Sequence, residues 1–190
     1  MSGAQRFDPC RLDVAAFAHA GARLQGEWPA QELRRLQQGA LPWPGDAAPP
    51  VVWTLQGEAR AVTGGEPEIR LHLQARTSLQ LSCQRCLQPM EVPLAVDTRL
   101  RFVRDEALAE QLDEQSEEDV LALPSRLDLR ELVEDELILA LPLVPRHAKC
   151  PRPLPMSAGE ETLDAEAPAA QGLAGLAALL GRAGPGGKPN

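Results

Sequence analysis

Residues 69–83 read IRLHLQARTSLQLSC, and this stretch decides the fold of the chain. An apolar, small or β-branched residue occupies every odd position from Ile69 to Cys83, whereas every even position carries a polar or charged side chain. Alternation with a period of two residues is typical of a β-strand that has one buried and one solvated face. The stretch therefore predicts a long antiparallel strand.

Two neighbouring stretches show the same alternation. Apolar or β-branched residues stand on even positions from Val92 to Phe102, and a further series on odd positions runs from Trp53 to Ala61. The Gly64-Gly65 pair after this last series is a typical turn. We expect the two longest strands to pair as a hairpin.

A helical period replaces the alternation in residues 127–142, LDLRELVEDELILALP. Asp128 is a suitable N-cap, and Pro142 stops the helix because it lacks a backbone donor. At 100° per residue, Glu136 projects between apolar residues of the same helix face. We therefore predict that Glu136 is a buried, paired carboxylate, for which the arginines of the sheet are candidate partners.

The remaining segments complete the predicted architecture. Helical spacing in residues 11–24 and 28–36 predicts short N-terminal helices, and LPWPGDAAPP at 41–50 predicts a loop. Residues 151–190 are rich in Pro, Ala and Gly, which predicts a flexible tail with a short apolar segment at 173–180. The expected fold is a single α+β domain, residues 1–150, in which an antiparallel sheet with a long hairpin packs against one main helix.

Charge is concentrated in one segment of the chain. The formal net charge is -8, and an acidic loop is expected at 105–119. A negative protein repels a phosphate backbone, and the absence of Tyr with only 3% aromatic residues disfavours base stacking. The acids of this loop are Asp105, Glu106, Glu110, Asp113, Glu114, Glu117, Glu118 and Asp119.

The sequence also indicates the cellular compartment. No apolar run reaches the roughly 18 residues of a membrane span, and the N-terminus lacks the pattern of a secretion signal. We expect a cytoplasmic protein with no membrane partner. In that reducing compartment, closely spaced cysteines bind metal or do redox work more often than they form lasting disulfides.

Two short motifs have the spacing of metal ligands. Cys83 and Cys86 form a C-x2-C pair where the hairpin must turn, and His147 and Cys150 form an H-x2-C pair after the predicted helix. Together they would supply the Cys3His ligand set of a structural zinc site. The alternative is that Cys83 is a core residue and the second pair belongs to an exposed loop. Thioredoxin-like redox chemistry is disfavoured because Cys83 ends a strand instead of beginning a helix.

CQRCLQPMEVPL at 83–94, followed by LDLRELVEDELILALPLVPRHAKC at 127–150, resembles the YceD family of large ribosomal RNA subunit accumulation proteins. The resemblance extends to FDPCRL and LQGEWPAQELRRL near the N-terminus, to the acidic insertion and to LAGLAALLGR near the C-terminus. It implies a bacterial, non-catalytic factor that supports the synthesis, processing or stability of 23S ribosomal RNA. Neither an enzymatic activity nor a small-molecule substrate is expected.

Two modes of action remain open. The protein could contact 23S ribosomal RNA or a preribosomal large subunit through arginines on the polar sheet face, unless that face is merely solvated. Alternatively, the acidic loop could shield a basic ribosomal protein or assembly factor, unless the loop only aids solubility. We expect capture of a basic protein to dominate and RNA contact to be weak. The candidate RNA-binding arginines are Arg70, Arg76, Arg99 and Arg101.

Overall fold

A computed structural model describes residues 6–46, 48–116 and 118–151, which fall within one compact unit. The predicted tail and its apolar segment 173–180 lie outside the described residues, apart from Pro151. Among the described residues, no helix has the length and apolar character needed to cross a membrane. The helices are α1 (Val14–His19), α2 (Glu106–Asp113) and α3 (Leu129–Leu139), with 3-10 turns at Pro9–Arg11, Ala30–Glu32 and Pro44–Asp46. The strands are β1 (Arg23–Trp28), β2 (Val51–Arg60), β3 (Glu68–Ser82), β4 (Pro89–Val103) and β5 (Asp119–Ala122).

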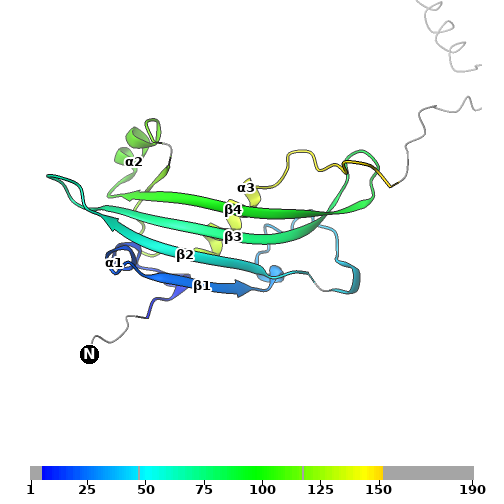
Figure 1. Cartoon of the computed structure of the whole chain (residues 1–190), viewed down its shortest axis with the longest axis horizontal. Helices are drawn as coiled ribbons and strands as arrows, with labels where there is room; N and C mark the ends of the chain where they lie inside the picture. The colour runs from blue at the N-terminus through cyan, green and yellow to red at the C-terminus, as the bar shows by residue number, and fades with distance from the viewer. Residues whose placement is uncertain (1–5, 47, 117, 152–190) are drawn as a thin grey trace, which may run out of the picture. The chain divides into compact units, whose positions relative to one another are not determined.

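The α+β fold class is confirmed. The five strands form one sheet in the order β1-β2-β3-β4-β5, in which β1 to β4 are antiparallel and β5 is parallel to β4. The sheet is therefore mixed. The predicted hairpin is present, with Ile69 opposite Phe102 at one end and Ser82 opposite Pro89 at the other. In Figure 1, α3 crosses the sheet on the side away from the viewer.

One face of the sheet forms the core, as the alternation predicts. The odd positions of β2 and β3 and the even positions of β4 are buried beneath α1 and α3. The main helix begins after Asp128, whose side chain accepts hydrogen bonds from the backbone N–H groups of Arg130 and Glu131. Because α3 covers this face, the opposite, polar face is left open.

The N-terminal region differs from the expectation. The helix predicted over 11–24 is confined to Val14–His19, and residues 28–36 contain only a 3-10 turn. Gly21, with φ of 56°, follows the helix, and Leu24 belongs to strand β1. The chain leaves the helix here because residues 23–28 pair with the edge of β2, where their backbone groups form the hydrogen bonds of an antiparallel ladder.

The acidic segment 105–119 also differs from the loop that we expected. Asp105 caps helix α2 by accepting a hydrogen bond from the Leu108 N–H, and Asp119 begins strand β5. Ala109 of α2 and Val120 of β5 are buried. The segment is structured because these two side chains and the pairing with β4 tie it to the sheet.

Glu136 was predicted to be buried and paired, with the sheet arginines as candidate partners, and both predictions are wrong. Glu136 is half-buried and accepts a hydrogen bond from Thr98 Oγ1 at 3.0 Å. The buried carboxylate of α3 is Glu134, which pairs with Arg35 from outside the sheet. The helix is therefore rotated so that residues 33–36 pack over Glu134.

Candidate metal centre

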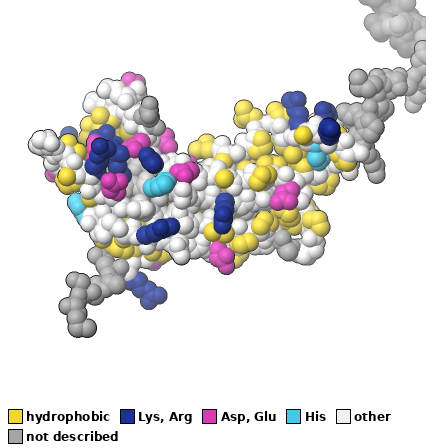
Figure 2. All heavy atoms as spheres, in the orientation of Figure 1, with side chains coloured by type: hydrophobic (Ala, Val, Ile, Leu, Met, Phe, Trp, Pro, Cys, Tyr) yellow, Lys and Arg dark blue, Asp and Glu magenta, His cyan; other side chains and the backbone are white. Residues whose placement is uncertain are grey.

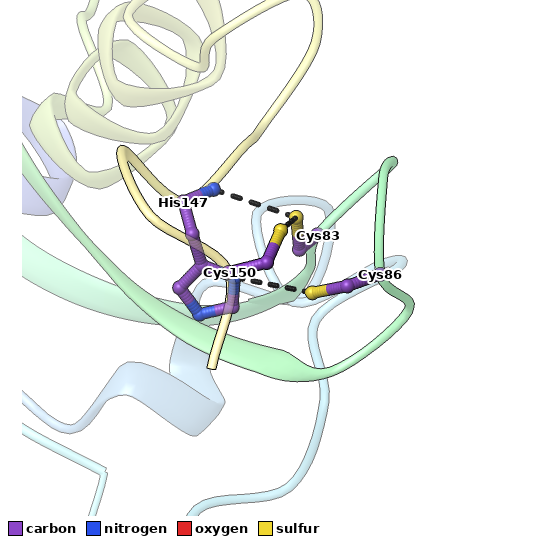
Figure 3. Close-up of side chains that lie close together, drawn as sticks. All are labelled: Cys83, Cys86, His147 and Cys150. Carbon is purple, nitrogen blue, oxygen red and sulfur yellow. Dashed lines mark hydrogen bonds between the residues drawn. The ribbon is translucent and has the colours of Figure 1, made fainter. Parts of the chain in front are cut away.

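Both predicted ligand pairs meet at the turn of the β3–β4 hairpin. Cys83 and Cys86 flank the tip of that hairpin, and His147 and Cys150 belong to the segment that follows α3 (Figure 3). Their ligand atoms all lie within 4.8 Å of one another. Cys83 Sγ is 4.0 Å from Cys150 Sγ, and Cys86 Sγ is 3.4 Å from His147 Nδ1.

One backbone hydrogen bond joins the two segments, and another closes the hairpin turn. The Gln84 N–H donates to the Pro145 carbonyl at 2.9 Å, and the Leu87 N–H donates to the Cys83 carbonyl at 2.9 Å. Leu87 has φ of 58°, a left-handed conformation that costs a leucine on the order of 1 kcal/mol. The tight turn directs both cysteine side chains of the hairpin toward the same point.

The four side chains have the spacing of a tetrahedral metal site. With Zn–S bonds of about 2.3 Å, tetrahedral geometry separates two ligating sulfur atoms by about 3.8 Å. The 4.0 Å between Cys83 and Cys150 is close to that value, and all four cysteines of the chain are free thiols. The cluster can therefore hold a metal ion. Cys83 is buried, as the alternative also expects, but it is not part of the main hydrophobic cluster.

The electrostatic surroundings favour a thiolate at Cys83. Burial alone would raise the pKa of this thiol, but backbone N–H groups of His147, Arg85 and Cys86 point at the sulfur and lower the pKa to about 5. For Cys86, burial and the neighbouring sulfur atoms of Cys150 and Cys83 raise the pKa. A bound cation would relieve this crowding of negative charge.

Arg85 contacts the cluster, which the ligand motifs alone did not predict. Its Nε donates to Cys150 Sγ at 3.0 Å, and a terminal nitrogen donates to the His147 carbonyl at 3.1 Å. Such contacts to ligating atoms orient metal ligands and tune their basicity. The only signal in the sequence is the placement of an arginine between the two cysteines of CQRC.

The candidate RNA-binding arginines lie on the open face of the sheet, but they are not equivalent. Arg70 and Arg101 stand opposite each other and both bind Glu68, at 2.9 and 2.8 Å. Arg70 also binds Glu118 at 2.8 Å. Arg76 and Arg99 are exposed and make no ion pair within the described part of the chain.

The acidic residues are likewise divided. Asp105 is an N-cap, the Asp113 carboxylate accepts from the Val120 N–H, and Glu118 binds Arg70. Glu117 lies outside the described residues. Glu106, Glu110 and Glu114 are exposed, and their side chains have no hydrogen-bond or ion-pair partner among the residues with described positions.

Comparison with known proteins assigns the chain to a family. A family model described as "Large ribosomal RNA subunit accumulation protein YceD" matches residues 71–180. A curated relative from Haemophilus influenzae, named "Large ribosomal RNA subunit accumulation protein YceD", is 31% identical over 140 residues, which cover 74% of this chain and 76% of the relative. No solved structure matches the chain. The extent of both matches shows that this chain belongs to the YceD family.

Proposed function

We propose that this protein is a non-catalytic, cytoplasmic factor of ribosome biogenesis that supports the synthesis, processing or stability of 23S ribosomal RNA. The family match carries the proposal, because the family is named for accumulation of large-subunit ribosomal RNA. Deletion of the gene should lower the amount of 23S relative to 16S ribosomal RNA, and the full chain should restore it. An unchanged ratio in the deletion strain would contradict the proposal.

The open sheet face supports weak contact with RNA through two arginines. Arg76 and Arg99 are exposed, and arginine has the geometry to bind a phosphate through two hydrogen bonds. Arg70 and Arg101 contribute less, because Glu68 and Glu118 neutralise them. Figure 2 shows the result: Lys and Arg side chains on this face are scattered among Asp, Glu and His instead of forming one positive area.

A second candidate function is the capture of a basic ribosomal protein or assembly factor by α2. Glu106, Glu110 and Glu114 are spaced four residues apart and therefore lie on one side of the helix. Like charges at this spacing destabilise a helix by about 0.2–0.5 kcal/mol per pair, and negative charge near the C-terminal end opposes the helix dipole. A cationic partner would remove this repulsion.

The capture hypothesis is tested by changing only acids that have no structural partner. Replacing Glu106, Glu110 and Glu114 by Gln should weaken the binding of basic large-subunit proteins and should make that binding less sensitive to salt. The unfolding midpoint should stay the same or rise. The matched control replaces Glu27, Glu66 and Glu91, which are exposed elsewhere. Equal loss of binding in both variants would show that only net charge matters.

Zinc is the metal that the cluster fits best. A Cys3His set in tetrahedral arrangement is typical of structural zinc sites. Protein purified without added metal should contain about one zinc per chain, as a closed structural site implies. Cys86→Ser should lose the metal and Cys10→Ser, at an exposed cysteine outside the cluster, should keep it. Less than about 0.1 zinc per chain in the unaltered protein would contradict zinc binding.

A further inference from the structure

The end of the molecule that carries the metal cluster is basic, in contrast to the chain as a whole. We define the metal-bearing tip as residues 83–91 and 142–151. It contains Arg85, Arg146 and Lys149 but only one acid, Glu91, in a chain with a formal net charge of -8. Figure 2 shows Lys and Arg side chains gathered at the end where the hairpin turns.

Among residues 6–46, 48–116 and 118–151, two of these three cations have no partner. Arg146 and Lys149 are exposed and make no side-chain hydrogen bond or ion pair within the described residues. Arg85 instead donates to Cys150 Sγ and to the His147 carbonyl. With a divalent metal bound, three thiolates leave one negative charge, which Arg85 offsets. Within the described residues, the charges of Arg146 and Lys149 therefore have no compensating acid.

The tip is far from the acidic segment. The hairpin turn precedes β4 at Pro89, whereas α2 follows the other end of β4 after Val103 (Figure 1). A strand of this length, at about 3.3 Å per residue, places the two ends about 45 Å apart. This distance is several times the Debye length, which is about 8 Å at physiological salt. The acids on α2 therefore do not cancel the local positive potential of the tip.

We propose that the metal-bearing tip binds the phosphate backbone of ribosomal RNA through Arg146 and Lys149, with the metal and Arg85 fixing the loop that presents them. This inference rests on the proposed role in 23S ribosomal RNA accumulation and adds a contact surface separate from the open sheet face. An acidic chain can bind RNA in this way because only its local charge meets the phosphates.

The test is a salt titration of binding to protein-free 23S ribosomal RNA. The Arg146→Ala/Lys149→Ala variant is compared with Arg11→Ala/Arg34→Ala, which removes the same charge at exposed positions outside the tip. Loss of two phosphate contacts should reduce the slope of log K against log salt by about 1.4 to 1.8. The control should keep the slope of the unaltered protein. Metal content and the unfolding midpoint, measured on each variant, verify that the tip is intact.

Three results would overturn the inference: no RNA binding by the unaltered protein, an unchanged slope in the tip variant, or equal losses in both variants. If the unaltered protein binds polyglutamate more tightly than RNA, and this binding requires Arg146 and Lys149, the surface binds an acidic protein instead. Failure here is distinguishable from failure of the proposed function. If the proposed function is wrong, the unaltered chain does not restore 23S ribosomal RNA in deletion cells. If only the inference about the tip is wrong, both the unaltered chain and the tip variant restore it.

Discussion

Glu134 shows how one side chain joins the N-terminal region to the main helix. Its side chain lies in the core-facing half of α3, with only 7% of the residue exposed. One carboxylate oxygen accepts from the backbone N–H groups of Arg35 and Leu36, at 2.6 and 3.1 Å. The other accepts from Arg35 Nε at 3.0 Å. Residues 35 and 36 belong to no helix or strand, so the Glu134 carboxylate supplies the acceptor that regular secondary structure would otherwise provide for their backbone N–H groups.

Glu134→Ala should lower the free energy of unfolding by about 2–4 kcal/mol, because it leaves backbone donors buried without an acceptor. Glu131→Ala, at an exposed position of the same helix, should change it by less than about 0.5 kcal/mol. Urea unfolding of both variants measures the difference. Equal stability of the two would mean that water satisfies these donors.

Glu136 should make stability depend on pH. Burial raises the pKa of this carboxyl, and the hydrogen bond from Thr98 only partly opposes the shift. Protonation of Glu136 therefore favours the folded state. Its contribution to stability is fully present below the pKa of the carboxyl in the unfolded chain and is lost as pH rises through its pKa in the folded protein. Glu136→Gln, which stays neutral, should be more stable than the unaltered protein at pH 7. This advantage should disappear near pH 4; an advantage independent of pH would contradict the assignment.

At the scale of elements, α1 packs against β2 because a glycine lets the backbones approach closely. A Cβ added to Gly57 would lie 2.6 Å from Phe17 Cδ1 and 2.9 Å from Ala18 Cα. The Gly57 N–H also donates to the Ala22 carbonyl at 2.9 Å, which anchors the connection from α1 to β1. The short helix is therefore held by contact with the sheet more than by its own length.

Gly57→Ala should destabilise the protein by about 1–3 kcal/mol, since the added methyl group must displace the backbone of α1. Gly65→Ala is the matched control, because its Cβ would have only one neighbour, at 4.0 Å. Thermal unfolding compares the two. A Gly57 variant as stable as the control would show that α1 shifts at little cost.

At the scale of the whole molecule, the metal cluster links two segments that lie about 60 residues apart in the sequence. The hairpin tip and the segment after α3 share the cluster and the Gln84–Pro145 hydrogen bond. The core beneath α1 and α3 is formed by other residues. Metal binding should therefore stabilise the tip locally and leave the core unchanged.

Removal of the metal by a chelator should speed amide hydrogen exchange at residues 83–88 and 145–150, with little change in the central strands. Cys86→Ser should show the same exchange pattern without chelator, and Cys10→Ser should not. Faster exchange throughout β3 and β4 would show instead that the metal is required for the entire sheet.

The long strands and the main helix were predictable because local pattern determines them. Alternation from Ile69 to Cys83, a capping Asp128 and a terminating Pro142 act within a few residues of the chain. The two ligand pairs were also visible as short motifs. Strand β1 could have been found from the alternation of Leu24, Gly26 and Trp28, but the helical spacing before it concealed this signal.

Other features depend on contacts between distant residues, which a local pattern does not encode. Pairing with β4 ordered the acidic segment, and packing of residues 33–36 against α3 selected Glu134 instead of Glu136 for burial. Glu68 and Glu118 decided which sheet arginines are neutralised. The sequence by itself determined the long hairpin, the main helix and the ligand types, since these follow from side-chain periodicity and chemistry. Only the tertiary structure decided that Cys83 and Cys86 meet His147 and Cys150, because chain folding sets the distances between segments.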